Sequence, residues 1–196
     1  STQATTYVIF GKASGFGTVQ LVDDQAPPGG FVLRGEEDAP GYGGTTVASA
    51  GDINGDGLDD VYICGAKDQP GVLYQQAKQG RFIKTNQSLL QSDSLSEDTD
   101  ALFFDADSDG DQDLYVCSGG NEFSPNSTAL INRLYINDGR RRFSKPRQIL
   151  PSYIFESTSC VRAADYDGDR DLDLFVGVRL KPFGYGYPCK SYLLQN

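Results

Sequence analysis

The sequence predicts an all-β protein built from repeated antiparallel units of four strands, and two repeated patterns carry this prediction. The first is an acidic segment that occurs three times, as DINGDGLDD at 52–60, DADSDGDQD at 105–113 and DYDGDRDLD at 165–173. A short apolar strand pattern follows each segment, at 61–66, 114–120 and 174–180. Because the flanking strands repeat together with the acidic segments, the repeat defines the architecture.

The second repeated pattern is a hairpin that lies between the acidic segments. LYQQAKQGRFIK at 73–84 is similar to LYINDGRRRFSK at 134–145, and each contains a strand, a Gly-containing turn and a second strand opened by Phe. VIFGKASGFGTV at 8–19 has the same shape, and SYLLQN at 191–196 matches its first half. Each unit is therefore strand, acidic loop, strand, connection, strand, turn and strand, which is the pattern of a β-propeller blade.

We expect one repeat region over residues 1–196, with about three blades plus a partial one. A hairpin at 1–24 forms the partial blade, and blades follow at 25–90, 91–150 and 151–196, the last without its outer strand. These units contain two, four, four and three predicted strands. The segments 85–100 and 119–130 are predicted to be loops. The propeller is thus incomplete, or it is completed by pairing between molecules.

Composition and charge exclude several classes of function. The chain has 196 residues, a formal net charge of -10 and no His. A strongly acidic chain is poorly suited to nucleic acid or to anionic membranes, and without His it has no Ser-His-Asp, Cys-His or HExxH chemistry. Its apolar stretches are too short to span a membrane. Since the chain begins at Ser1 and lacks Met, we interpret it as a processed chain or an excised segment.

The four cysteines show no metal-binding spacing. They are Cys64, Cys117, Cys160 and Cys189, and none forms a CxxC pair, so zinc is not expected. Two disulfides outside the cell and four buried thiols both remain open.

The acidic segments predict metal loops, because oxygen side chains at alternate positions let a tight loop surround one ion. The ligands expected at positions 1, 3, 5, 7 and 9 are Asp52, Asn54, Asp56, Leu58 (through its carbonyl) and Asp60 in loop one; Asp105, Asp107, Asp109, Asp111 and Asp113 in loop two; and Asp165, Asp167, Asp169, Asp171 and Asp173 in loop three. These are hard oxygen donors, which favour Ca²⁺, about one ion per loop. More than half of the 27 acidic residues lie in these loops, where they repel one another without a cation.

The loops differ from EF-hands, and loop three departs from the pattern of the other two. Position 12, where an EF-hand has Glu, falls within the strand that follows each loop, so we expect Asp at position 9 to complete the metal shell. Position 6 is Gly57 in loop one and Gly110 in loop two, but Arg170 in loop three. A positive φ at Arg170 costs roughly 1 kcal/mol, which makes the third site the weakest prediction.

The motifs resemble a known repeat family over nearly the whole chain, from Tyr7 to Asn196. GDINGDGLDDVYICGA and YVIFGKASGF resemble the FG-GAP repeats of integrin α-subunit propellers, whereas ALFFDADSDGDQDLYVCSGGNEF and CVRAADYDGDRDLDLFVGVRL are similar to VCBS-type repeats of bacterial ASPIC/UnbV-like proteins. The resemblance implies a calcium-bearing β-propeller outside the cell or in the periplasm, used for adhesion and ligand recognition, with structural ions. It also implies about seven blades, more than this chain contains.

The sequence is compatible with three functions. The preferred one is a non-catalytic module, secreted or on the cell surface, that contacts a protein or glycan ligand through its loops. The alternative is a structural subunit that assembles through its end strands, with 15–22 adding beside 191–196, into a ring or filament. The third is a carbohydrate-active enzyme, which is disfavoured because the carboxylates outside the loops, including Glu97 and Glu122, form no evident pair. FGYGYP at 183–188 is either a sugar-stacking loop or a turn with aromatic packing.

Overall fold

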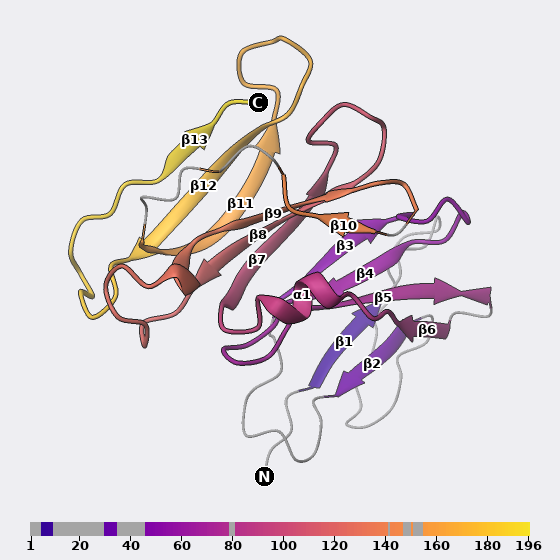
Figure 1. Cartoon of the computed structure of the whole chain (residues 1–196), viewed down its shortest axis with the longest axis horizontal. Coiled ribbons are helices and arrows are strands. Elements are labelled where there is room, and N and C mark those ends of the chain that lie inside the picture. Colours follow the sequence, from indigo (N-terminus) through magenta and orange to yellow (C-terminus); the bar gives the residue numbers. More distant parts are fainter. Residues whose placement is uncertain are drawn as a thin grey trace.

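The computed structural model describes residues 5–9, 30–34, 46–78, 81–140, 142–146, 150 and 155–196, and the described part is an all-β arrangement of separate antiparallel sheets (Figure 1). Blade 1 comprises β3 (Val47–Gly51), β4 (Asp60–Ile63), β5 (Val72–Ala77) and β6 (Arg81–Lys84). Blade 2 comprises β7 (Glu97–Phe104), β8 (Asp113–Gly119), β9 (Arg133–Asn137) and β10 (Phe143–Ser144). Blade 3 comprises β11 (Ser157–Ala164), β12 (Asp173–Leu180) and β13 (Tyr192–Leu194). The predicted all-β fold of propeller-like blades is confirmed.

A separate two-stranded sheet precedes the blades. Its strands, β1 (Thr5–Ile9) and β2 (Gly30–Arg34), pair in antiparallel register. The sequence predicted that a tight hairpin at 8–19 would supply the partner, but within the described residues the partner of β1 is β2. Residues 10–29, which contain most of that predicted hairpin and the proposed end strand 15–22, lie outside the described residues.

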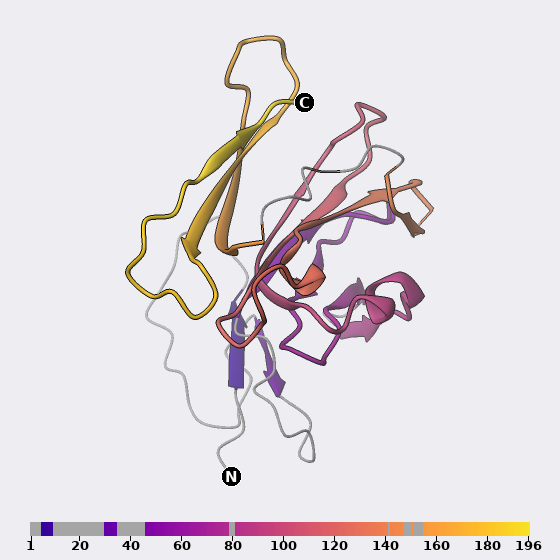
Figure 2. The ribbon, with the colours of Figure 1, turned by 60° about the vertical axis from the view of Figure 1, so that its left-hand side comes forward.

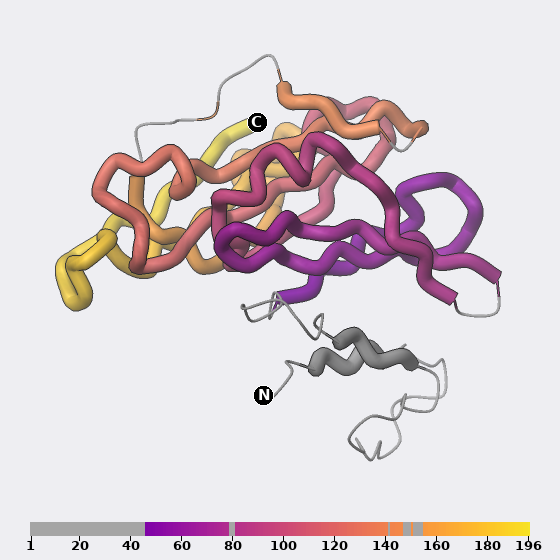
Figure 3. The backbone as a smooth tube through the Cα atoms, turned by 60° about the horizontal axis from the view of Figure 1, so that its bottom comes forward, coloured from indigo at the N-terminus to yellow at the C-terminus, as the bar shows by residue number. Residues whose placement is uncertain are grey.

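The segment 85–100 contains more regular structure than the sequence predicted. A single turn of helix, α1 (Ser88–Ser92), occurs where a loop was expected, and β7 begins at Glu97. Leu90 of α1 is buried in the core between blades 1 and 2, and Leu89 packs against the same core. Burial of these two side chains stabilises a turn that would not form in isolation. The tube drawing shows this magenta connection passing from blade 1 to blade 2 (Figure 3).

The blades stack through their first strands. β7 lies between β3 and β11, and the three sheets fan out from these strands (Figure 2). The hydroxyl of Thr46 donates to the carbonyl of Thr99 at 3.1 Å, and the hydroxyl of Thr99 donates to the carbonyl of Thr158 at 2.9 Å. The same hydroxyl-to-carbonyl link therefore joins blade 1 to blade 2 and blade 2 to blade 3.

Apolar side chains fill the space between neighbouring blades. Tyr62 of blade 1 meets Phe103 of blade 2 edge-on, with ring centroids 6.2 Å apart. Between blades 2 and 3, Tyr115 and Cys117 pack against Val161 and Val176. Alternate residues of each strand point to the same face, so the central blade contributes one face to each core.

All four cysteines are free thiols in the structure. Cys64, just after β4, and Cys117, within β8, are both buried, and burial raises the pKa of the Cys117 thiol to about 12. Such thiols are unreactive at neutral pH, so of the two alternatives the structure shows buried thiols at these two positions.

A buried carboxylate of blade 2, Asp98, links blades 1 and 2. Asp98 accepts hydrogen bonds from the Tyr62 hydroxyl at 2.9 Å and from the Gly65 N–H at 2.8 Å, and it pairs with the guanidinium of Arg133. Burial and the attraction of Asp98 have opposite effects on the pKa of Arg133, and the net shift is upward. The Asp98 carboxylate therefore binds a strand residue and a loop residue of blade 1, while Arg133 of its own blade balances its charge.

Replacing Asp98 with Ala should cost roughly 3–5 kcal/mol of unfolding free energy, because Arg133 would remain buried without its partner. Denaturant unfolding monitored by circular dichroism measures the change. The control is Asp68→Ala, which removes an exposed carboxylate paired with Lys67 at 2.9 Å and should cost less than about 1 kcal/mol. Equal effects of the two substitutions would contradict the role assigned to Asp98.

Candidate metal sites

The three acidic loops lie at one end of the molecule. Each joins the first and second strands of its blade, and in Figure 1 the loops lie along the top and right-hand side of the sheets. The connections between second and third strands, at 64–71, 120–132 and 181–191, lie at the opposite end. The repeat thus places all the predicted metal ligands at one end.

Aspartate at position 1 organises each loop by accepting backbone N–H groups. Asp52 accepts from Asp56 at 3.0 Å and from Gly57 at 2.7 Å. Asp105 accepts from Asp109 at 3.2 Å and from Gly110 at 3.0 Å. In loop three, Asp165 accepts from Gly168 at 2.7 Å and from Arg170 at 3.2 Å. The three loops therefore share one fold, with a small shift in loop three.

Two positions in each loop adopt left-handed backbone conformations. Position 6 has φ of 82° at Gly57, 92° at Gly110 and 84° at Arg170, so the strained arginine that the sequence predicted is present. Position 4 is also left-handed, with φ of 74° at Gly55, 62° at Ser108 and 84° at Gly168. The sequence analysis missed position 4, although Gly in loops one and three was a signal for it.

Carboxylate oxygens converge in loops two and three. Oxygens of Asp105, Asp107 and Asp109 lie within 4.8 Å of one another, and so do oxygens of Asp165, Asp167 and Asp173. Ligands that bind one Ca²⁺ at about 2.3–2.6 Å can be at most about 5 Å apart. In loop one, position 3 is the amide of Asn54, whose Oδ1 accepts the N–H of Asp56 at 3.0 Å.

Aspartate at position 9 is buried and binds backbone N–H groups. Asp113 accepts from Asn137 at 2.7 Å and from Ala106 at 2.8 Å, and Asp173 accepts from Asn196 at 3.0 Å and from Tyr166 at 2.8 Å. Asp60 likewise accepts from Gln76 at 2.8 Å. Each carboxylate therefore ties its loop to the third strand of the blade or to the residues just after that strand. Its predicted role as a metal ligand stays a prediction.

The remaining predicted ligands lie on the loops as the repeat suggests. Asp56, Asp109 and Asp169 at position 5 accept the N–H of the residue at position 7, which is Leu58, Asp111 or Asp171. This bond orients position 7 in the same way in all three loops.

Desolvation, hydrogen bonds and neighbouring carboxylates shift the pKa values of the loop aspartates. Burial raises the pKa of Asp113 to about 6, against the opposing effect of its two backbone hydrogen bonds. Desolvation and the neighbouring charge of Asp109 raise the pKa of Asp107. In loop three, the hydrogen bond with Asp169, followed by desolvation, raises the pKa of Asp171 to about 6. These three carboxyl groups therefore bind a proton more tightly than isolated aspartates do.

The donor set fits a hard divalent cation. Its side-chain ligands are carboxylates and one amide, with no nitrogen or sulfur donor. One carboxylate oxygen of Asp60 and one of Asp171 are buried and have no hydrogen-bond partner among the described residues. An oxygen in that condition is costly unless a cation or water meets it, so the loops are consistent with Ca²⁺.

The opposite end contains a carboxyl pair that the sequence analysis did not find. Glu97 and Glu122 form a side-chain hydrogen bond, and desolvation together with the charge of Glu122 raises the pKa of Glu97. Gly120 makes the approach feasible, because a Cβ there would lie 2.7 Å from Glu97 and 2.9 Å from Glu122. The expectation of no pair was wrong for these two residues, since the 25-residue separation along the chain hides the contact.

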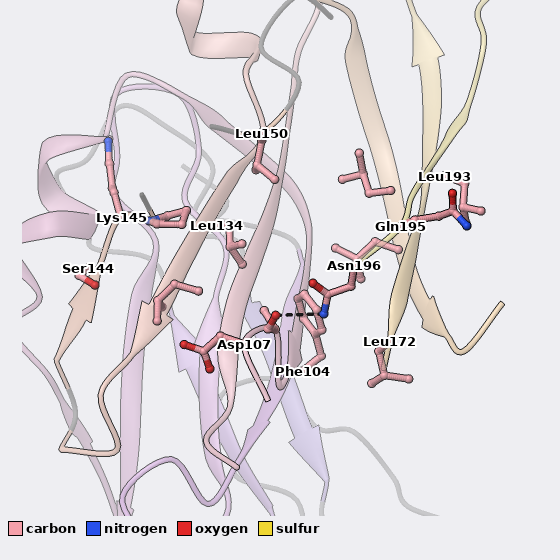
Figure 4. Close-up of a pocket in the computed structure, with 15 residues that line it drawn as sticks. Phe104, Asp107, Leu134, Ser144, Lys145, Leu150, Leu172, Leu193, Gln195 and Asn196 are labelled. Carbon is pink, nitrogen blue, oxygen red and sulfur yellow. Dashed lines mark hydrogen bonds between the residues drawn. The ribbon is translucent and has the colours of Figure 1, made fainter. Parts of the chain in front are cut away.

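A groove of about 920 Å³ opens between blades 2 and 3 near loop two. Figure 4 shows Phe104, Leu134 and Leu150 on one side and Leu172 and Leu193 on the other. The amide of Asn196 bridges the groove to the carbonyl of Ala106 at 3.0 Å. Leu150 precedes acidic loop three by the same number of residues as Leu90 precedes acidic loop two. Leu90 fills the space between blades 1 and 2, and Leu150 packs against the core between blades 2 and 3. The groove is therefore the equivalent packing space between blades.

A family model for the FG-GAP-like repeat matches this chain twice, over residues 52–116 and 105–176. The two matches together cover more than half of the 196 residues. The chain therefore belongs to the FG-GAP-like repeat family, as its motifs indicated. A search of the curated proteins finds no match.

Repeats of this family are typical of extracellular, β-propeller-like recognition modules, are typically non-enzymatic and often bind Ca²⁺. Among the described residues, no helix has the length and apolar character needed to cross a membrane.

Replacing Arg170 with Gly should raise the unfolding free energy by roughly 1 kcal/mol, since Gly adopts a positive φ without the steric cost that an L side chain bears. Calcium binding by loop three should be unchanged or tighter, as measured by calorimetry. Arg170→Ala is the matched control, because it removes the same charge but keeps the Cβ, and it should give no gain. Weaker calcium binding in the Gly variant would show that the assignment of position 6 in loop three is wrong.

The stability of the metal-free protein should fall as pH rises from about 4 to about 6. Asp113 binds its proton more tightly when folded, with a pKa of about 6 against 3.8 for the ordinary side chain. The folded state therefore holds more protons than the unfolded state within this window, and that advantage is lost as pH rises through the folded pKa. Urea unfolding in EDTA across the window measures the slope. A stability that rises through the same window would contradict the pKa assignment.

Proposed function

We propose that the chain is a non-catalytic, calcium-binding recognition module of the extracellular space. Its three acidic loops bind about three Ca²⁺ ions that stiffen the blades, and the loops at the opposite end contact a protein or glycan ligand. The observation that carries the metal assignment is the threefold recurrence of one loop geometry, in which Asp at position 1 accepts two loop N–H groups.

The chemistry of the loops supports a structural role for the ions. The buried Asp at position 9 links each loop to the third strand or its end, so a cation held by the same loop strengthens a connection within the blade. A cation also offsets the repulsion among the loop carboxylates, which adds to desolvation in raising the pKa of Asp107 and to the Asp169 hydrogen bond and desolvation in raising the pKa of Asp171. Metal that binds only the folded state stabilises it by mass action.

The carboxyl pair at the other end does not favour hydrolysis of glycosides. The carboxyl groups of glycosidases are separated by about 5–9.5 Å, so that a sugar or a water fits between them. Glu97 and Glu122 instead hydrogen-bond to each other directly. This contact supports a binding module over the carbohydrate-active enzyme.

Removing calcium with EDTA should lower the melting temperature by several degrees, and elemental analysis should find about three Ca²⁺ per chain. Asp109→Ala should reduce the stoichiometry by one, because it removes a carboxylate from the cluster in loop two. Asp59→Ala is the matched control, since position 8 is acidic only in loop one and is not a predicted ligand. An unchanged melt in EDTA, with no calcium bound, would contradict the proposal.

A second candidate is a structural subunit that self-associates, and the exposure of blade 3 favours it. The three blades carry equivalent cross-strand pairs, which are Tyr62–Leu73, Tyr115–Leu134 and Phe175–Leu193. Tyr62 and Tyr115 are each 1% exposed because the next blade covers them, whereas Phe175 is 48% exposed. Ser159, which corresponds to Thr99, donates to Gly177 within its own blade at 3.5 Å. The face of blade 3 that carries Phe175 and Leu193 therefore has the composition of a surface between blades.

If this face mediates assembly, light scattering at high concentration should detect species larger than the monomer, and Phe175→Asp should abolish them. Leu95→Asp is the matched control, because Leu95 is an exposed apolar side chain away from that face. Removing residues 1–24 tests whether the N-terminal segment contributes. A stable monomer at high concentration would eliminate this candidate.

A further inference from the structure

An exposed aromatic loop occupies the end of the molecule opposite the acidic loops. It is the connection between β12 and β13, drawn in yellow beside the connection between β8 and β9 (Figure 1). Phe183, Tyr185 and Tyr187 are 68%, 84% and 69% exposed, and glycines separate them along the chain. At the same end, Phe123 of the neighbouring connection is buried. Exposure of three large rings therefore distinguishes this connection from the one beside it.

The backbone of the aromatic loop is held in place by several contacts. The N–H of Gly184 donates to the carbonyl of Lys181 at 2.8 Å, and the N–H of Tyr187 donates to the carbonyl of Gly184 at 3.2 Å. The N–H of Phe183 donates to Asn121 Oδ1 at 2.8 Å, which ties the loop to blade 2. These bonds present the rings to solvent on a fixed support, and a fixed support lowers the ordering cost of binding.

Phe183 adopts a conformation that a bulky residue rarely occupies. Its φ is 59°, in the left-handed region, where a bulky side chain is a genuine outlier. The residues on either side, Pro182 and Gly184, are buried. Strain maintained by surrounding structure is concentrated at ligand-binding sites, and here it accompanies rings that are not buried in a core.

A hollow of about 780 Å³ adjoins the base of the aromatic loop. Its lining includes the aromatic rings of Phe155 and Tyr192, the pyrrolidine ring of Pro182 and the polar side chains of Asn126 and Lys190. Lys181 and Glu156 also line it and pair with each other at 3.4 Å, so their charges offset. The volume is within the range of small-molecule sites, and the lining offers both ring faces and hydrogen-bonding groups.

We infer that the aromatic loop and the adjoining hollow form a binding site for carbohydrate, specifically for oligosaccharides of pyranose rings with equatorial hydroxyls. Such a ring presents flat C–H faces that stack on Tyr and Phe, while its hydroxyls at the rim exchange hydrogen bonds with amide and ammonium groups. The inference rests on the proposed function, because it names the ligand class of the loop end.

The local charge and shape favour a neutral saccharide over a protein anchor. The chain has a net charge of -10, yet the hollow carries an offset ion pair and the ammonium of Lys190. A protein hot spot needs a well-packed pocket that excludes water around its anchor. The mixed polar lining of an open hollow instead suits a ligand that keeps hydroxyl groups around its whole rim.

The test is an array of immobilised oligosaccharides that includes cellohexaose, chitohexaose and polygalacturonate, probed with the full chain in calcium. Calorimetry then measures the affinity for the best neutral oligosaccharide. The double variant Tyr185→Ala/Tyr187→Ala should bind at least about tenfold more weakly, with an unchanged melting temperature. Tyr166→Ala is the matched control, because Tyr166 is 71% exposed on acidic loop three, and it should bind as the wild type does.

The outcomes separate this inference from the proposed function. Binding of cellohexaose or chitohexaose that the double variant loses supports the carbohydrate site. A wild-type chain that binds no saccharide overturns the inference, while calcium binding and recognition of a purified protein ligand would leave the proposed function standing. Equal saccharide affinity in the wild type and the double variant also overturns it, because the saccharide would then bind elsewhere.

Discussion

A buried carboxylate at the ninth position of each acidic loop is the interaction on which the architecture of every blade depends. Asp60, Asp113 and Asp173 are shielded from solvent, and each accepts a backbone N–H from the third strand or from just after it. A buried carboxylate is costly unless its oxygens find donors. The loop, the second strand and the end of the third strand must therefore form together, which couples the geometry of the acidic loop to the folding of the sheet.

Coupling of this kind explains why the loops repeat more faithfully than the contacts between blades. Between blades 1 and 2, Asp98 accepts a hydrogen bond from Tyr62 and pairs with Arg133. At the equivalent sequence position, blade 3 has Thr158, whose hydroxyl donates to Asn132 at 2.8 Å. Asn132 in turn donates to the hydroxyls of Tyr115 and Tyr192. Different polar groups satisfy the same buried site, because the interface requires only that each donor and acceptor be paired.

The fold was predictable from the sequence to the extent that it depends on local repetition. Acidic loops followed by apolar strands located β3, β4, β7, β8, β11 and β12, since turn residues and alternation act over short distances. The left-handed φ at Arg170 was predictable in the same way, from the Gly at the equivalent positions. Helix α1 was not, because its stability comes from burial of Leu90 between blades. The contact of Glu97 with Glu122 was not predictable either, because it depends on how distant parts of the chain fold together and no local sequence pattern indicates it.

The two ends of the blades are under different physical constraints, and this separation makes the proposed ligand recognition compatible with the proposed metal binding. At the acidic end, the backbone is determined by hydrogen bonds to carboxylates, so a substitution there disturbs the position of several N–H groups at once. At the other end, the connections vary in length and composition, and the hydrogen bond from Phe183 to Asn121 joins one connection to the next. A surface composed of such neighbouring connections can change its side chains without altering the acidic loops. The strained, exposed aromatic loop of blade 3 therefore lies where substitutions that create a binding surface destabilise the fold least.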